Sequence, residues 1–419
     1  MAIKISSLIS VSEIQSARSR ISDVVVKTPF MYNFNLSEKY DCNIYLKRED
    51  MQSVRSFKIR GAYNKIASLN EKEIANGIVC ASAGNHAQGV ALSCCRLGIK
   101  GKIFMPNTTP SQKIKKVKYF GKSFVEVVLI GDTFDDAYEA ACLDANRTNA
   151  EFIHPFNDKK VIEGQGTVGA EILEQTDVAL DYILVAVGGG GLISGVGSYF
   201  KTLSPKTKII AIEAEGAPAL SESLKLQKVV RLNSIDGFAD GIAVKAIGSL
   251  TFEICQKVVD SNILVPEGKI CSTILSLYND DAIVVEPAGA VSIAALDFIK
   301  DNIKGKNVAV IVCGGNNDIE RTQEIKERAL LYEGLKHYFI IKFPQRAGAL
   351  KDFLNVLGPN DDITHFQYTK KNNRTNGPAL VGIELKKKED FEMLTDRMNK
   401  QGINYQHINN NPMLFEMLV

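Results

Sequence analysis

Short apolar runs alternate with amphipathic stretches along the chain as far as about residue 330. The apolar runs predict strands at residues 44–46, 78–81, 102–105, 124–130, 182–187, 209–212 and 308–312. The amphipathic stretches at 88–97, 133–146 and 164–175 predict helices between them. Continuous apolar strands separated by helices are typical of parallel sheets that are covered on both faces. We therefore expect an α/β fold with two doubly wound parallel-sheet subdomains, the smaller one at about residues 50–150.

The pattern changes after the charged helix predicted at residues 319–331. Strands are predicted at 337–343, 361–368 and 379–385, and helices at 349–357 and 389–401. The order βαββα over this length predicts a small ferredoxin-like α+β module. We expect a catalytic domain at residues 1–325, a linker at 326–335 and a separate domain at 336–419.

Composition and charge exclude several classes of protein. The chain is 45% hydrophobic and 23% charged, as in ordinary globular proteins, and its net charge is only +2. No strong field indicates a nucleic-acid partner, and no apolar run reaches the ~18 residues of a membrane helix. Eight scattered cysteines lack a Cys-x-x-Cys motif, and the start of the chain lacks a signal-peptide pattern. We expect a cytoplasmic protein with reduced thiols and no membrane partner.

Four consecutive glycines, Gly188, Gly189, Gly190 and Gly191, separate the predicted strand 182–187 from a helix. Without Cβ atoms, their N–H groups can turn toward one point, and the helix adds its free N-terminal donors. A tight strand-to-helix crossing is the alternative, but one or two glycines suffice for that. The run does not match G-x-G-x-x-G, which disfavours a dinucleotide. The segment therefore predicts a phosphate cradle.

Lys58 lies between Phe57 and Ile59 in the segment SFKIRG of residues 56–61. A lysine becomes nucleophilic when desolvation or a nearby cation lowers its pKa. Taken alone, such a lysine is more often a surface residue. Together with a phosphate cradle, however, it fits pyridoxal phosphate, a cofactor that needs both an anion grip and a lysine that forms a Schiff base.

A second strand-loop-helix segment, SAGNHAQG at residues 82–89, follows the predicted strand 78–81. Ser82 and the free amides of the following helix could hold a carboxylate. The amide of Asn85 offers a donor and an acceptor for a phenolic oxygen. His86 is a weaker candidate for a catalytic base, because no partner is in view. Without the other motifs, the loop would indicate only a helix cap.

Cys313 ends the predicted strand 308–312. Its thiol could donate weakly to a pyridine nitrogen. A buried, inert cysteine is the alternative.

Four motifs together resemble those of one enzyme family: residues 56–62 (SFKIRGA), 82–89, 188–192 (GGGGL) and 286–290 (EPAGA). The chain resembles the fold-type II pyridoxal phosphate enzymes and, within them, is similar to the biosynthetic threonine dehydratases, or threonine ammonia-lyases. The resemblance covers nearly all of residues 10–419. It implies deamination of L-threonine, by β-elimination of water, to 2-oxobutanoate and ammonia, the first step of isoleucine biosynthesis.

The resemblance also implies the site residues. Lys58 would be catalytic and would carry the cofactor. The cofactor contacts would be Lys58, Phe57, Asn85, Gly188, Gly189, Gly190, Gly191, Leu192 and Cys313. The substrate carboxylate would lie against Ser82, Ala83, Gly84, Asn85 and His86. Glu286 could contact the cofactor or substrate, although a carboxylate at a helix terminus is the simpler reading.

Two departures from the family pattern affect the expected activity. Cys313 stands where the biosynthetic enzymes more often have serine, which leaves a serine/threonine dehydratase or a serine racemase as alternatives. Racemase relatives use a divalent metal near residues 213–217, but residue 219 is alanine here, so we expect no required metal. An alternative of another class is a non-catalytic amino-acid sensor.

The C-terminal segments at residues 343–350 and 357–359 resemble the ACT-like module that senses end product. We therefore expect an isoleucine or valine effector at residues 336–419. The chain has room for a single such module. The resemblance further implies a homotetramer.

Overall fold

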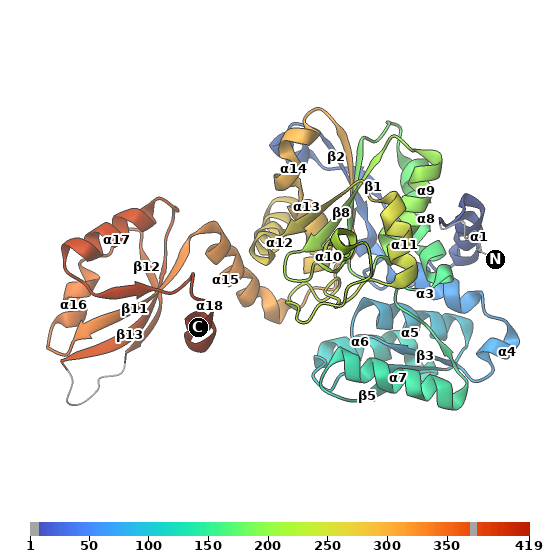
Figure 1. The fold of residues 1–419 in the computed structure, drawn as a ribbon, viewed down its shortest axis with the longest axis horizontal. Coiled ribbons are helices and arrows are strands. Elements are labelled where there is room, and N and C mark those ends of the chain that lie inside the picture. Colours follow the sequence, from blue (N-terminus) through green and yellow to red (C-terminus); the bar gives the residue numbers. More distant parts are fainter. Residues whose placement is uncertain (1–7, 369–374) are drawn as a thin grey trace. The chain divides into compact units, whose positions relative to one another are not determined.

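The computed structural model of the chain describes residues 8–368 and 375–419. These residues form two compact units, which divide between Asp318 and Ile319. The larger unit contains two sheets with helices on their faces, and the smaller unit contains one (Figure 1). Within the described ranges, every helix is too short or too polar to span a membrane.

The larger sheet of the first unit has six strands in the order β1-β2-β10-β7-β8-β9. Their bounds are β1 (Phe30–Tyr32), β2 (Asn43–Arg48), β7 (Tyr182–Ala186), β8 (Lys208–Ala214), β9 (Ser261–Val265) and β10 (Asn307–Val312). All neighbours are parallel except β1, which pairs antiparallel with β2. The central strands are almost entirely buried, as their continuous apolar runs predict.

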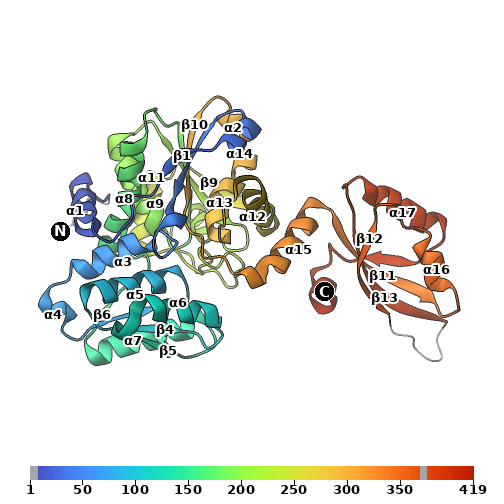
Figure 2. The ribbon, with the colours of Figure 1, turned by 180° about the vertical axis from the view of Figure 1, so that it is seen from behind.

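Helices cover both faces of this sheet. One face carries α8 (Lys159–Gln175), α9 (Gly191–Leu203) and α11 (Ser249–Val258), and the other carries α12 (Glu267–Asp281), α13 (Pro287–Ala294) and α14 (Leu296–Ile303) (Figures 1 and 2). The remaining helices of the first unit are α1 (Val11–Ile21), α2 (Phe34–Tyr40), α3 (Lys58–Ala67), α4 (Glu71–Ile74), α5 (Asn85–Leu97), α6 (Ser111–Gly121), α7 (Phe134–Thr148) and α10 (Ala219–Leu226).

The smaller sheet has four parallel strands in the order β5-β4-β3-β6. They are β3 (Ile78–Ala81), β4 (Gly101–Met105), β5 (Val125–Leu129) and β6 (Glu151–Phe152). Alternate residues of β3 enter separate cores: Ile78 and Cys80 pack with α5, while Val79 and Ala81 pack with α7. The prediction of two doubly wound sheets is therefore confirmed.

The first α-helix of the smaller unit is α15 (Thr322–Glu333), and the last is α18 (Pro412–Leu418). Between them lie β11 (Lys336–Pro344), α16 (Ala349–Leu354), β12 (Asp362–Tyr368), β13 (Asn376–Glu384), α17 (Asp390–Lys400) and β14 (Tyr405–His407). The antiparallel sheet has the order β12-β13-β11-β14, and Phe339, Phe353 and Leu394 lie in its core. The predicted α+β module is confirmed, and β14 extends the expected order to βαββαβ.

The division between the units lies between Asp318 and Ile319. Residues 326–335, which we expected to form a linker, lie mostly in α15 and lead into β11. The charged helix α15 therefore joins the sheet of the second unit to the chain that leaves the first.

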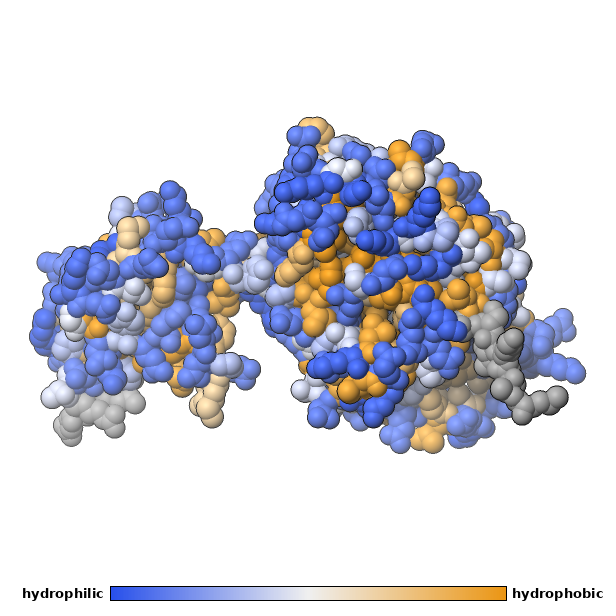
Figure 3. Space-filling view, turned by 45° about the horizontal axis from the view of Figure 1, so that its top comes forward, coloured by the Kyte–Doolittle hydropathy of each residue, from blue (hydrophilic) through white to orange (hydrophobic). Residues whose placement is uncertain are grey.

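The free edge of the larger sheet carries exposed hydrophobic side chains. Met31 and Tyr32 of β1 are 47% and 45% exposed, and Phe34 at the start of α2 is 66% exposed. Figure 3 shows hydrophobic residues interrupting the hydrophilic surface of the larger unit. Exposed apolar surface of this kind is typical of contact with another protein chain.

Candidate active site

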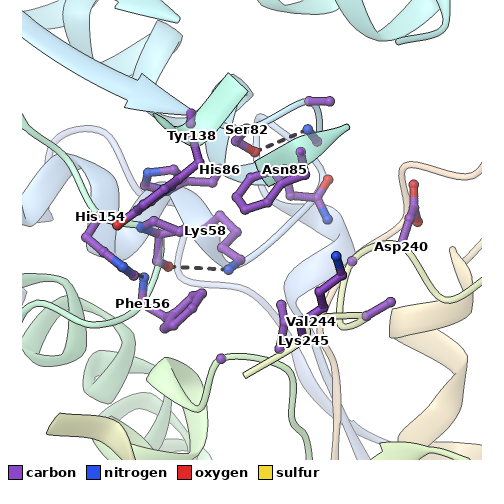
Figure 4. Close-up of a pocket in the computed structure, with 18 of the residues that line it drawn as sticks. Lys58, Ser82, Asn85, His86, Tyr138, His154, Phe156, Asp240, Val244 and Lys245 are labelled. Carbon is purple, nitrogen blue, oxygen red and sulfur yellow. Dashed lines mark hydrogen bonds between the residues drawn. The ribbon is translucent and has the colours of Figure 1, made fainter. Parts of the chain in front are cut away.

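A cavity of about 740 Å³ lies in the first unit between the smaller and the larger sheet. The smaller half contributes the loop after β3 and the starts of α3, α5 and α7 to its lining, and the larger half contributes Gly189, Glu286 and the loop at residues 240–249. Lys58, Asn85 and His154 point into this space (Figure 4). Its position between two α/β sheets, at the ends of their strands, is where ligands of such folds bind.

Lys58 is the first residue of α3, and its side chain is half-buried because the amine faces the cavity. The Nζ atom lies 3.4 Å from the carbonyl oxygen of Pro155 and 5.2 Å from the ring centre of Phe57. Desolvation by the surrounding protein lowers the pKa of Lys58 to about 8, and nearby Cys313 and Glu286 oppose this shift. A substantial fraction of the amine is therefore neutral near physiological pH, as a nucleophile requires.

The four glycines connect β7 to α9 and leave no room for side chains. Gly190 has φ of +87°, which favours glycine. A Cβ at Gly188 would lie 2.7 Å from the carbonyl oxygen of Ile242, and one at Gly189 would overlap the ring of Phe156. The first amides of α9 have no partner within the helix. Bare main chain with free N–H groups beside the cavity fits a phosphate group.

Replacing Gly189 with alanine should weaken cofactor binding, because the added methyl group displaces the Phe156 ring from the cradle. We expect the dissociation constant for pyridoxal phosphate to rise about 10- to 100-fold, equivalent to one lost hydrogen bond to a charged group. Fluorescence titration of the apoprotein with the cofactor measures this dissociation constant. Gly237→Ala is the matched control, since Gly237 is exposed and its added Cβ would meet nothing within 4 Å. Equal affinity in the two variants would contradict the cradle.

The loop after β3 lines the cavity with all five residues predicted for the substrate carboxylate: Ser82, Ala83, Gly84, Asn85 and His86. Gly84 caps α5, and its N–H donates to Ser82 Oγ at 3.2 Å. The main-chain N–H groups in the first turn of α5 lack partners within the helix and are suited to an anion.

His86 has a defined protonation state. Its Nε2 lies 3.0 Å from the carbonyl oxygen of Ile153, which only accepts, so Nε2 carries the proton. Burial, together with the charge of Lys58, lowers the pKa of His86 to about 3, and Nδ1 is buried without a partner. The ring is therefore neutral and presents an acceptor, so a carboxylate would use the main-chain N–H of His86. Such a low pKa makes His86 a poor general base.

Asn85 forms hydrogen bonds on both sides of its amide. Nδ2 donates to Glu286 Oε1 at 2.5 Å, and Oδ1 accepts from Asn316 Nδ2 at 2.7 Å. Glu286 precedes α13, but its side chain does not cap that helix and instead faces Asn85. Burial, with Asp240 nearby, raises the pKa of Glu286 to about 7. The helix-terminus reading of Glu286 is thus too simple, because its carboxylate belongs to the cavity.

Cys313 is buried beside the cavity, and its Sγ donates to the carbonyl oxygen of Ala288 at 3.1 Å. Burial strongly raises the pKa of this thiol, so it is neutral. Its carbonyl oxygen accepts from the N–H of Phe57 at 3.1 Å, which ties it to the residue before Lys58. Seven predicted residues line the cavity surface: Lys58, Ser82, Ala83, Gly84, Asn85, His86 and Gly189. The others lie next to these in the chain or behind them: Phe57, Gly188, Gly190, Gly191, Leu192 and Cys313.

Several lining residues escaped the sequence analysis because no motif marks them. His154 Nδ1 accepts from the N–H groups of Phe156 and Asn157 at 3.2 and 2.9 Å, so its Nε2 carries the proton. Asp135 pairs with Lys245 at 2.9 Å between α7 and the loop at 240–249. Asn316 lies in the segment CGGNN after the strand 308–312, where an amide side chain at the end of a buried strand is a signal for a polar cavity contact.

Among the described residues, no group of three or more His, Cys, Asp or Glu side chains could hold a metal ion. Glu213, in the segment considered for a metal, accepts hydrogen bonds from the N–H groups of Leu220 and Ser221 at 2.7 and 2.9 Å. Its two oxygens therefore cap α10.

Comparison with known proteins identifies the class. A family model described as pyridoxal-phosphate dependent enzyme matches residues 21–314, and a model of the C-terminal regulatory domain of threonine dehydratase matches residues 327–418. The chain therefore belongs to the pyridoxal-phosphate-dependent enzymes, and its cofactor is pyridoxal phosphate.

Within that class, the chain belongs to the threonine dehydratase family. It is 61% identical to the biosynthetic L-threonine dehydratase IlvA of Halalkalibacterium halodurans, over 98% of this chain and 99% of that protein. It is 58% identical to the enzyme of the same name from Bacillus subtilis, over 100% and 99%. The structure of processed threonine deaminase isoform 2 from Solanum lycopersicum matches with a TM-score of 0.73 and 40% identity, over 77% of this chain and 90% of that one. Maize serine racemase matches with a TM-score of 0.71 and 32% identity, over 77% and 98%.

Proposed function

We propose that this protein deaminates L-threonine to 2-oxobutanoate and ammonia by pyridoxal-phosphate-dependent elimination of water. The observation that carries the proposal is the cavity that brings the Lys58 amine, with its lowered pKa, together with the glycine cradle. The names of the relatives that match over almost the full chain support the substrate.

The described residues fit the cofactor. Lys58 would be its covalent attachment point, and the main-chain N–H groups of residues 188–192 would hold its phosphate. Asn85 would donate to its ring hydroxyl through its second amide hydrogen, and the neutral Cys313 thiol would turn from Ala288 O to serve its ring nitrogen. When bound, pyridoxal phosphate supplies an electron sink for the substrate Cα–H bond.

The chain's own residues bind the substrate and move the proton. Ser82 and the main-chain N–H groups of residues 83–86 hold the substrate carboxylate, which orients the Cα–H bond. The Lys58 amine takes the Cα proton, because its lowered pKa leaves it able to accept a proton near neutral pH.

Two assays on the holoenzyme test the proposal. L-Threonine should yield 2-oxobutanoate and ammonia in equal amounts, and borohydride reduction followed by peptide mapping should place the cofactor on Lys58. Label on another lysine would contradict the assignment. Assays of L-serine deamination test the serine dehydratase alternative. Assays of D-serine formation from L-serine test the racemase alternative, which the fold match to maize serine racemase supports. A colourless protein without a bound aldehyde would favour the amino-acid sensor.

We further propose that the unit Ile319–Val419 senses isoleucine or valine as end product. The match of residues 327–418 to a regulatory domain supports this proposal. The absence of disulfides among all eight described cysteines supports a reducing, cytoplasmic location. Exposed hydrophobic side chains along β1 and α2 support self-association into a homotetramer.

Adding L-isoleucine to the full-length enzyme should raise the half-saturating concentration of L-threonine about fivefold or more, since allosteric coupling is typically about 1–3 kcal/mol. Steady-state saturation curves with and without the effector measure this shift. D-Isoleucine is the matched control, because it has the same composition and the opposite configuration. Superimposable curves with L-isoleucine would contradict its regulatory role.

A further inference from the structure

Four side chains at the cavity form a chain of hydrogen bonds that all run in one direction. Lys116 Nζ donates to Asn316 Oδ1 at 3.0 Å, and Asn316 Nδ2 donates to Asn85 Oδ1 at 2.7 Å. Asn85 Nδ2 then donates to Glu286 Oε1 at 2.5 Å.

The direction of this chain is set by its ends. Lys116 can only donate, and the second N–H of Asn316 donates to the carbonyl oxygen of Val54 at 2.8 Å, which can only accept. Turning the Asn316 amide over would face its N–H group toward the Lys116 ammonium and its oxygen toward the Val54 oxygen. The orientation of Asn316 is therefore fixed, and it forces the oxygen of Asn85 toward Asn316 and its nitrogen toward Glu286.

This orientation leaves one N–H of Asn85 for the cavity. An amide nitrogen carries two hydrogens, and Glu286 takes one of them. The opposite orientation would turn the oxygen of Asn85 toward the Glu286 side of the cavity. A phenolic oxygen of a bound cofactor would then meet an acceptor.

The chain also crosses between the two halves of the first unit. Lys116 and Asn85 lie on α6 and α5 beside the smaller sheet, whereas Asn316 follows β10 and Glu286 precedes α13 at the larger sheet. The orientation of Asn85 therefore depends on both halves.

We propose that Asn316 is a positioning residue that acts through Asn85, orienting its amide so that it donates a hydrogen bond to the cofactor's ring hydroxyl. This inference rests on the proposed function, because it assumes that Asn85 contacts the cofactor.

Asn316→Asp is the sharpest test because it preserves shape and reverses polarity. A carboxylate at this position accepts from Lys116 but cannot donate to Asn85 Oδ1, so the Asn85 amide turns over. We expect the dissociation constant for pyridoxal phosphate to rise about tenfold or more and the visible absorbance band of the lysine-bound cofactor to shift. Asn307→Asp is the matched control. It also removes an N–H donor, 2.8 Å from Ala179 O, but at the other end of β10. Its affinity and spectrum should remain those of the native protein.

The decisive measurement repeats Asn316→Asp in an Asn85→Ala background. If Asn316 acts through Asn85, the Asn316→Asp substitution should change cofactor affinity in this background by less than about twofold. Two outcomes would overturn the inference. One is a double variant in which the losses of cofactor affinity add. The other is an Asn316→Asp variant with native spectrum and cofactor affinity and only a lower melting temperature. If Asn316→Asp does not fold, Asn316→Ala replaces it, with the same expected direction and the same criteria. Failure of the proposed function is distinguishable, because the unmutated protein would then bind no cofactor at Lys58.

Discussion

Replacing Lys58 with alanine is expected to lower 2-oxobutanoate formation from L-threonine by about 10⁴-fold or more, because the change removes both the covalent attachment point and the base. No other described lysine or histidine replaces it well. Lys113 and Lys245 line the same cavity but are paired with aspartates, and Lys116, which also lines it, donates to Asn316 Oδ1. The pKa of His86, lowered to about 3 mainly by burial, makes it a weak proton acceptor.

The experiment compares initial rates of the purified holoenzymes under saturating L-threonine. Lys72→Ala is the matched control, since Lys72 is exposed on α4, away from the cavity. Its rate should equal that of the native enzyme. A rate for Lys58→Ala within about 100-fold of native would contradict the proposed base.

Replacing Arg60 with methionine is expected to destabilise the first unit by about 3–5 kcal/mol, because it leaves buried carboxylates without their partner. Arg60 is 0% exposed, two residues after Lys58. Its guanidinium donates to both oxygens of Glu49 at 2.7 Å and to those of Glu171 at 2.7 and 2.8 Å. Lys47 Nζ also donates to Glu171 at 2.6 Å. These four buried side chains carry two positive and two negative charges, so removing one cation unbalances them.

Urea unfolding, followed by the absorbance of the bound cofactor, measures the stability of this unit. Arg18→Met is the control, because the partner of Arg18, Glu174, is partly exposed; the expected loss there is below about 1 kcal/mol. Equal losses of unfolding free energy in the two variants would contradict the importance of burial.

Burial alone would raise the pKa of Glu49, but Arg60 holds it below its usual value. A lowered folded-state pKa means that this contribution is present above the unfolded-state pKa and is lost as pH falls.

The local pattern of the chain was enough to predict most elements of the fold. Strands β3, β4, β7, β8 and β10 and the principal helices follow from apolar runs and helical periodicity, which are properties of neighbouring residues. Four short strands were missed: β1, β9, β14 and the two-residue β6. β1 and β14 have three residues each, and β9 begins with serine and asparagine, so their identity as strands comes from pairing with neighbours distant in sequence.

The cofactor, too, was predictable, because a phosphate cradle needs consecutive residues without Cβ atoms and Lys58 stood in a recognisable motif. The partners of these residues were not predictable from spacing. Only the structure shows that Asn85 donates to Glu286 and accepts from Asn316. Only the structure shows that Arg60 is buried against Glu49 and Glu171. Hydrogen bonds are directional and short-ranged, so the choice among many polar side chains depends on how the two sheets pack. Sequence alone thus determined which groups could perform the chemistry, whereas the tertiary structure decided their protonation, orientation and partners.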